Sequence, residues 1–148
     1  MSVKSNKGSS KTVALSVVIP TYNGEKWLPA TIDHVLAALK KARLDTYEIV
    51  VIDDGSTDNT VKAIKSYAKT IKESIKVVSQ ENAGRFSARN RGTREARYDL
   101  LLFVDTRVFI GESSLKYVLK EYKKDPTRKV WCSHVRVKKE GNIYARFW

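Results

Sequence analysis

The chain has 148 residues, of which 28 are Lys or Arg and 16 are Asp or Glu, so its formal net charge is +12. This length favours a single domain, and a hydrophobic content of 42% supports a buried core, which excludes a mainly disordered chain. One cysteine excludes an internal disulfide framework and a cysteine-rich zinc site, and two histidines argue against a multi-histidine metal site.

The positive charge is concentrated toward the C-terminal end of the sequence. Residues 116–148 carry a net charge of +7, residues 1–11 carry +3, and the long segment between them carries +2. Such a surplus indicates an anionic partner, namely nucleic acid, acidic lipid or a phosphorylated substrate. Solubility alone is the competing explanation.

Residues 1–12 are rich in Ser, Lys and Gly and are expected to form a flexible basic leader. They lack the apolar centre of a signal peptide. The longest apolar run, residues 100–104, is far shorter than the roughly 20 residues of a membrane helix. These features predict a cytoplasmic protein.

From residue 13 onward, short apolar runs alternate with amphipathic segments. Runs rich in β-branched residues predict buried strands, and apolar residues at helical spacing predict helices. Strands are expected at residues 15–19, 48–52, 75–78, 100–104 and 130–137, and helices at residues 25–41, 61–71, 85–97 and 115–122. The second helix is expected to be capped by Ser56, Thr57 or Asp58.

This alternation predicts an α/β fold with a mostly parallel central sheet and helices on both faces. Ligands of such sheets bind beyond the carboxyl ends of the strands. Polar and aromatic residues follow each of the first four predicted strands, at residues 20–24, 53–58, 80–84 and 105–107. Turn chemistry explains any one of these segments, but four on one edge predict a ligand site.

Three common motifs are absent. The sequence has no Gly-x-Gly-x-x-Gly after its first strand, no Gly-x-x-x-x-Gly-Lys-Ser/Thr and no Gly-x-Ser-x-Gly. These absences argue against a dinucleotide-binding domain, a P-loop protein and the usual serine hydrolase.

Three ordered segments resemble the family 2 glycosyltransferases. Residues 16–23 (Ser-Val-Val-Ile-Pro-Thr-Tyr-Asn) are similar to that family's opening strand, and residues 51–58 (Val-Ile-Asp-Asp-Gly-Ser-Thr-Asp) to its second-strand signature. Residues 80–84 with 88–92 resemble its third motif. The resemblance covers roughly residues 15–119. It implies the Rossmann-like nucleotide-diphospho-sugar transferase fold of the glycosyltransferase-A type and sugar transfer from a nucleotide diphosphate, usually with manganese or magnesium.

The resemblance and the chemistry of a nucleotide diphosphate together suggest the site residues. Tyr22 offers a flat surface for the base, and the resemblance implies that Asp54 accepts a hydrogen bond from it, with Asp53 nearby. A capped turn is the alternative for this carboxylate pair. Arg85 or Arg89 is expected to face the phosphates beside Gly84 and the start of a helix. The predicted donor-binding residues are Pro20, Thr21, Tyr22, Asn23, Asp53, Asp54, Gly84, Arg85, Arg89, Asp105 and Arg107.

The sequence departs from the family pattern after the fourth strand. The family typically has Asp-x-Asp there, and its last acid holds the metal, whereas this chain has Asp105-Thr106-Arg107. Asp105 is therefore the one predicted metal ligand, and Arg107 weakens the case for a divalent metal. One hypothesis is that Arg107 neutralises the leaving diphosphate in place of the metal. The other is that the site is degraded and binds weakly or not at all.

In the family, the base that activates the acceptor lies in a second half, which this sequence is expected to lack. No acid follows Glu140, and its turn is a poor place for a buried base. We therefore expect residues 13–148 to be a C-terminally short nucleotide-sugar-binding domain whose acceptor half is largely absent.

Three functions follow from these observations. The first is a glycosyltransferase that acts on an acceptor such as a lipid carrier or polysaccharide, with its basic C-terminal part resting on an anionic membrane. The second is a catalytically incomplete nucleotide-sugar-binding module. The third, a basic nucleic-acid-binding protein, lacks any recognition motif, so no nucleic acid is expected. The sequence does not indicate the donor base or sugar, the acceptor, the stereochemical outcome or the oligomeric state.

Overall fold

The structure is a computed structural model that describes residues 13–125, 127 and 130. The predicted leader, residues 1–12, lies outside the described residues, as does the predicted strand 130–137 except for Val130. The described residues form alternating strands and helices in the predicted order. They are β1 (Leu15–Thr21), α1 (Leu28–Ala42), β2 (Tyr47–Asp54), α2 (Thr60–Ile71), β3 (Ile75–Gln80), α3 (Arg85–Glu95), β4 (Leu101–Phe103) and α4 (Ser114–Lys124).

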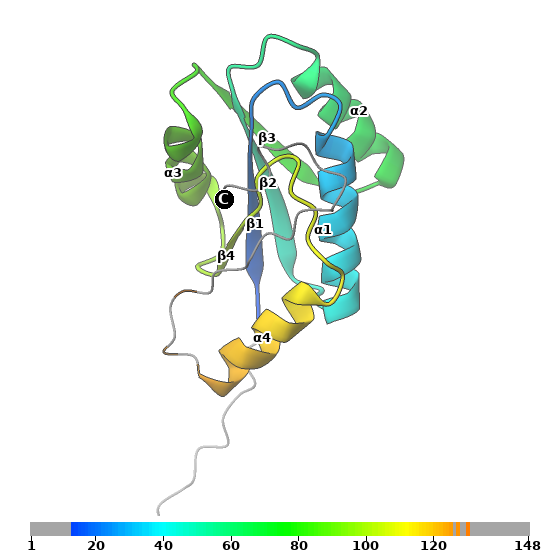
Figure 1. The fold of residues 1–148 in the computed structure, drawn as a ribbon, viewed down its shortest axis with the longest axis vertical. Coiled ribbons are helices and arrows are strands. Elements are labelled where there is room, and N and C mark those ends of the chain that lie inside the picture. The colour runs from blue at the N-terminus through cyan, green and yellow to red at the C-terminus, as the bar shows by residue number, and fades with distance from the viewer. Residues whose placement is uncertain (1–12, 126, 128–129, 131–148) are drawn as a thin grey trace, which may run out of the picture.

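The strands form one parallel sheet in the order β3-β2-β1-β4 (Figure 1). β1 pairs with β2 along its whole length, from Leu15 opposite Tyr47 to Thr21 opposite Asp53. On its other side β1 pairs with β4, where Val17 lies opposite Leu102. The chain thus steps outward from β1 through β2 to β3 and then returns to the far side of β1. The predicted parallel α/β sheet is confirmed.

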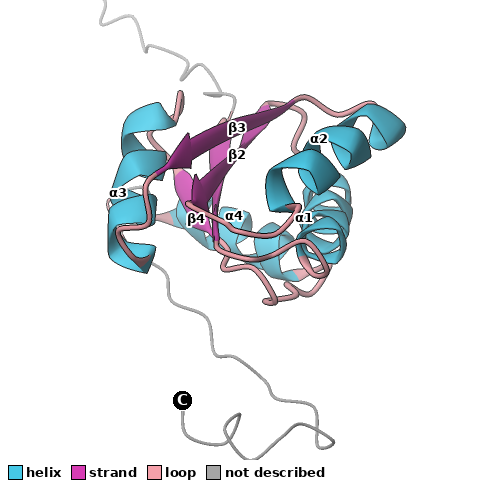
Figure 2. Ribbon diagram, turned by 90° about the horizontal axis from the view of Figure 1, so that it is seen from above, coloured by secondary structure: helices cyan, strands magenta, loops and turns pink. Residues whose placement is uncertain are grey.

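Helices cover both faces of this sheet, as predicted (Figure 2). Successive residues of a strand point to opposite faces, so Val17 packs in the larger core under α1, whereas Val18 faces α3. The larger core also contains Leu115 and Leu119 of α4. Both faces are therefore apolar, which is why the strands are continuous apolar runs in the sequence.

The two helix starts differ from the sequence-based expectations. α1 begins at Leu28 rather than at residue 25, because a turn comes first, in which Trp27 and Leu28 both donate from their backbone N–H to Gly24 O. α2 begins at Thr60 with Asn59 at the N-cap position, so the predicted cap residues are wrong by at least one position. Asp58 nevertheless accepts a hydrogen bond from the Thr60 N–H at 2.9 Å, and so satisfies one free donor of the helix start. In the part of the chain that the structure describes, no helix is long and apolar enough to cross a bilayer.

Candidate functional site

The candidate site lies where the strand order reverses, between the carboxyl ends of β1 and β4. Tyr22 follows β1 directly, and its side chain is 50% exposed. Asp105 stands two residues after β4. The loops after β1 and β4 pack closely, because a Cβ on Gly24 would stand 3.1 Å from Thr106 Cγ2. The fold therefore brings two predicted donor-binding segments together, although they are over eighty residues apart in the sequence.

Asn23 links the loop after β1 to the loop after β2 through hydrogen bonds. Its backbone N–H donates to Ser56 Oγ at 2.9 Å, and its side-chain Oδ1 accepts from the Thr57 N–H at 2.8 Å. Its φ of 49° is in the left-handed region, which Asn tolerates better than most residues. These contacts shape the loop that carries Tyr22, and the predicted role of Asn23 in donor binding stays a prediction.

Asp58 lies on the exposed side of the same loop pair. Slight burial raises its pKa, but hydrogen bonds from the Thr60 hydroxyl, the Thr60 N–H and the Glu25 N–H outweigh this effect. The net result is a pKa below the ordinary value of an aspartate. The ionised form is therefore the one that stabilises the loop pair.

This lowered pKa predicts a pH-dependent contribution to stability. Since the folded pKa lies below the unfolded one, the contribution of Asp58 is present above about pH 4 and disappears as the pH falls through the folded pKa. Urea unfolding should show wild type to be more stable than Asp58→Asn at pH 6, and the difference should shrink as the pH falls below about 4. Asp99→Asn, a change at an exposed turn residue, serves as the control. A difference between wild type and Asp58→Asn that is constant with pH would contradict this assignment.

Asp54 is buried, with only 4% of its surface exposed, and it organises the loop between β3 and α3. Its carboxylate accepts hydrogen bonds from Ala83 N–H at 3.0 Å, from Gly84 N–H at 2.9 Å and from Gln80 Nε2 at 2.7 Å. Its backbone carbonyl accepts from Asn82 Nδ2 at 3.0 Å. These four contacts fix where the chain enters α3.

Asp53 and the end of β1 are also closely packed. Asp53 is 4% exposed and accepts a hydrogen bond from Ser56 N–H at 3.2 Å, which closes a turn. Pro20 and Thr21 lie within the buried strand. The Pro20 carbonyl accepts from Thr106 Oγ1 at 3.0 Å, and Thr21 Oγ1 has no hydrogen-bond partner among the described residues. The Pro20 carbonyl therefore links β1 to the loop after β4, and the predicted donor-binding roles of Pro20 and Thr21 stay predictions.

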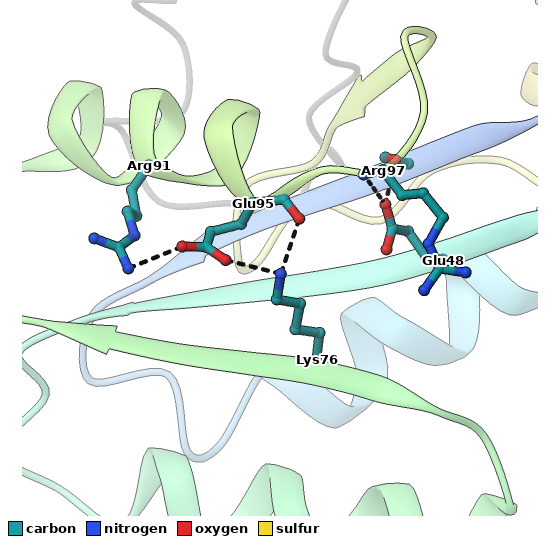
Figure 3. A network of polar contacts seen from close by, with 6 residues as sticks. Glu48, Lys76, Arg91, Glu95 and Arg97 are labelled. Carbon is teal, nitrogen blue, oxygen red and sulfur yellow. Dashed lines mark hydrogen bonds and ion pairs between the residues drawn. The ribbon is translucent and has the colours of Figure 1, made fainter.

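The arginines of α3 divide into two groups. Arg89 donates to both carboxylate oxygens of Asp105, at 2.7 and 2.9 Å, and Arg85 lies 3.5 Å from one of them. Arg91 pairs with Glu95 at 2.8 Å on a different side of the helix, where Lys76 also binds Glu95 (Figure 3). Arg85 and Arg89 therefore face the strand ends, whereas Arg91 forms an ion pair with Glu95 of its own helix.

Arg107 has an unusual backbone conformation, with φ of 77°. Its N–H donates to Thr31 Oγ1 of α1 at 3.2 Å, and Val108 N–H donates to Asp105 O at 2.9 Å, so the loop after β4 is a closed turn. The Arg107 side chain is exposed, and it has no hydrogen-bond or ionic partner within residues 13–125.

The residues at the end of β4 do not fit a divalent metal. Asp105, the predicted metal ligand, has both oxygens bound by Arg89, and the next position of the family pattern is a cation rather than a carboxylate. No group of three or more His, Cys, Asp or Glu side chains comes together among the described residues. A divalent ion at Asp105 would have to share this carboxylate with the Arg89 guanidinium, which places a positive charge beside the ion.

The predicted site residues are held by four further residues that the sequence analysis did not assign to the site. Gln80, Asn82, Thr31 and Thr106 hold the predicted ligands in place through hydrogen bonds. Gln80 and Asn82 lie within the third recognisable motif, so their presence there was a usable signal. Thr31 lies in a helix far along the sequence from Arg107, and no local pattern pointed to it.

Two hollows among the described residues lie away from the strand ends. One of 480 Å³ runs along the lysine-rich side of α2, and one of 710 Å³ lies between the end of α1 and the start of α4. Both are open, and neither is lined by a predicted donor-binding residue. We place the candidate site at the strand ends because the chemistry of a nucleotide diphosphate is met there and not in these hollows.

Comparisons with known proteins agree with this architecture. Residues 16–148 match the family model for glycosyl transferase family 2. The validoxylamine A glucosyltransferase of Streptomyces hygroscopicus subsp. jinggangensis (strain 5008) is 42% identical over 113 residues, which are 75% of this chain and 26% of that protein. The poly-beta-1,6-N-acetyl-D-glucosamine synthase of Staphylococcus aureus (strain COL) is 27% identical over 132 residues, which are 89% of this chain and 31% of that protein.

Solved structures match the fold in the same way. S. aureus TarS 1–349 in complex with UDP-GlcNAc matches with a TM-score of 0.61 and 30% identity, over 76% of this chain and 32% of that one. The mannosyltransferase PcManGT from Pyrobaculum calidifontis, in complex with GDP-Man and Mn²⁺, matches with a TM-score of 0.66 and 26% identity, over 76% and 33%. This chain therefore spans between a quarter and a third of the length of these proteins.

Proposed function

Because the chain belongs to glycosyl transferase family 2, we propose that it binds a nucleotide-diphosphate sugar at the carboxyl ends of β1 and β4 and donates the sugar to an acceptor. One observation carries the proposal, namely that an exposed aromatic residue follows β1 and the arginines at the start of α3 bind the loop after β4, and β1 and β4 are the two strands between which the strand order reverses. Tyr22 supplies the ring, and Arg85 and Arg89 line the start of α3. A nucleotide sugar needs both features, because its base is flat and its diphosphate is anionic.

The base is proposed to lie on Tyr22 with its edge toward the carboxylates that end β2. A carboxylate has about four acceptor positions. Asp54 uses three of them and Asp53 uses one, so both retain capacity for a base N–H. The rigid loops around them would reduce the entropy that is lost on binding.

The diphosphate is proposed to lie at the start of α3. The first backbone N–H groups of a helix have no intrahelical partner and favour an anion. Gly84, with φ of 86°, makes the turn that precedes them, and a Cβ there would contact nothing within 4 Å. Arg85 and Arg89 add two guanidinium groups beside these donors.

Transfer breaks the bond between the sugar's anomeric carbon and the diphosphate, which leaves with the bonding electron pair. Cations held at the diphosphate stabilise this developing charge more strongly than they stabilise the bound donor. The acceptor oxygen forms the new bond and loses its proton to a base that the described residues do not assign. A nucleotide-sugar-binding module without transfer is the second candidate.

The acceptor, the cellular location and contact with a membrane stay predictions. A lipid carrier or polysaccharide acceptor, a cytoplasmic location and contact of residues 116–148 with an anionic membrane are compatible with the net charge of +7 on that segment. Most of the segment lies outside the described residues.

Donor binding can be tested by calorimetric titration of the 148-residue chain with UDP-GlcNAc and with GDP-mannose. We expect at least one to bind, and we expect Arg89→Gln to weaken it about tenfold, because a charge-assisted contact is lost. Arg94→Gln is the matched control, because Arg94 is exposed near the far end of the same helix. Release of UDP or GDP in the presence of acceptors would distinguish a transferase from a binding module.

Two results would contradict the proposal. One is a folded protein that binds neither nucleotide sugar, nor UDP or GDP, with or without Mn²⁺. The other is an affinity that falls equally in Arg89→Gln and Arg94→Gln, since that would reflect net charge rather than a site.

A further inference from the structure

Two arginines of α3 bind the Asp105 carboxylate at the carboxyl end of β4, and a third arginine follows it in the same turn. We call Arg85, Arg89 and Arg107 the arginine cluster. Arg89 binds both oxygens of Asp105, Arg85 lies 3.5 Å from one of them, and Arg107 follows Asp105 by two residues in the same closed turn. Since only one negative charge offsets three positive ones, the cluster retains an excess of two positive charges.

Each of the three arginines keeps donor groups that could bind an anion. Arg107 is exposed and has no partner within residues 13–125, and the side chain of Arg85 is 68% exposed. The Nε of Arg89 is buried and has no acceptor among the described residues. Asp105 therefore does not satisfy all the donor groups of the arginine cluster.

The backbone of Arg107 adds an independent observation. Four residues other than glycine have a positive φ in the described chain: Asn23, Arg43, Lys72 and Arg107. Arg43 and Lys72 are C-caps of α1 and α2, where a left-handed residue is ordinary, and Asn is the residue that best tolerates it. Arg107 has neither explanation, and such backbone outliers concentrate at functional sites.

We infer that the arginine cluster holds the donor diphosphate without a divalent cation, and that Asp105 is a positioning residue for Arg85 and Arg89 rather than a metal ligand. This inference rests on the proposed function, because it concerns how the same donor is held. A nucleotide-diphosphate sugar carries one negative charge on each of its two phosphates, which matches the excess charge of the cluster. Arginine suits this role because its planar fork can bind two phosphate oxygens at once.

The test is calorimetric titration of the 148-residue chain with UDP-GlcNAc, GDP-mannose, UDP and GDP, in EDTA and in Mn²⁺. Wild type should bind in EDTA with an affinity within about threefold of that in Mn²⁺, a difference too small for a lost ligand-bridging ion. Arg107→Asn should bind about tenfold more weakly in EDTA, and Arg107→Asp about a hundredfold more weakly, because it also reverses the charge.

These substitutions are chosen so that the fold survives. Asn and Asp tolerate a left-handed backbone better than arginine does, and the hydrogen bond from the residue 107 N–H to Thr31 is retained. Arg94→Asp is the matched control, because it makes the same charge change near the far end of α3, about 8 Å beyond Arg89 and about 14 Å beyond Arg85 along the helix. Its affinity should stay within about threefold of wild type.

The outcomes separate this inference from the proposed function. Binding by wild type that is lost in EDTA and restored by Mn²⁺ would overturn the inference while supporting the proposed function. Unchanged affinity of Arg107→Asn in EDTA would overturn it as well. If no nucleotide binds under either condition while circular dichroism shows a folded chain, the proposed function fails, and the inference fails with it.

Discussion

Replacing Asp54 with alanine is expected to lower the free energy of unfolding by about 3–5 kcal/mol, because three donors lose their acceptor in a buried place. The donors are the N–H groups of Ala83 and Gly84 and the amide of Gln80. A typical domain of this size has a total stability of only about 5–15 kcal/mol, so the variant should be close to unfolding. Urea unfolding followed by circular dichroism measures the loss.

Two further variants sharpen this experiment. Asp54→Asn keeps one acceptor oxygen and should cost less than Asp54→Ala. Asp99→Ala removes an exposed carboxylate and is expected to change stability by less than about 0.5 kcal/mol. A loss below about 1 kcal/mol in Asp54→Ala would show that water replaces the carboxylate, and that the loop before α3 does not depend on it.

Replacing Gly92 with valine should have an effect of similar size through a different cause. A Cβ at Gly92 would stand 2.2 Å from Val18 Cγ1 and 3.3 Å from Ile52 Cγ1. In Gly92→Val, α3 must therefore move away from the sheet. Overpacking of this kind costs about 1–3 kcal/mol and more where the neighbours cannot move, as in a central strand. Displacement of α3 would also separate Arg89 from Asp105 and weaken donor binding about tenfold or more.

Thermal unfolding and donor titration of Gly92→Val measure these two effects. Thr93→Val is the matched control, because it places valine at the neighbouring exposed position of the same helix. It separates the helix propensity of valine from the clash with the sheet. If Gly92→Val and Thr93→Val melt at the same temperature, close contact between α3 and β1 is not what requires glycine.

For the described residues, the sequence alone was sufficient for the order and type of the elements. The runs 15–19 and 48–52 lie within β1 and β2, since strands that are buried on both faces are mostly apolar. Polar residues at the ends of these strands correctly placed Tyr22, Asp53 and Asp54 at one edge. Helix starts were predicted less well, because the turn around Gly24 and the cap of α2 depend on contacts between two loops.

The tertiary structure alone decided what each polar side chain binds. Asp54 and Asp105 look alike in the sequence as acids that follow strands. The fold places backbone N–H groups against Asp54 and the Arg89 guanidinium against Asp105. The pattern of apolar and polar residues around a position indicates whether its side chain is buried. Which group that side chain binds depends on the distant segments that the strand order brings beside it. Because β4 returns to the side of β1, the turn that contains Asp105 and Arg107 lies beside the arginines of α3. The sequence alone did not show this neighbourhood.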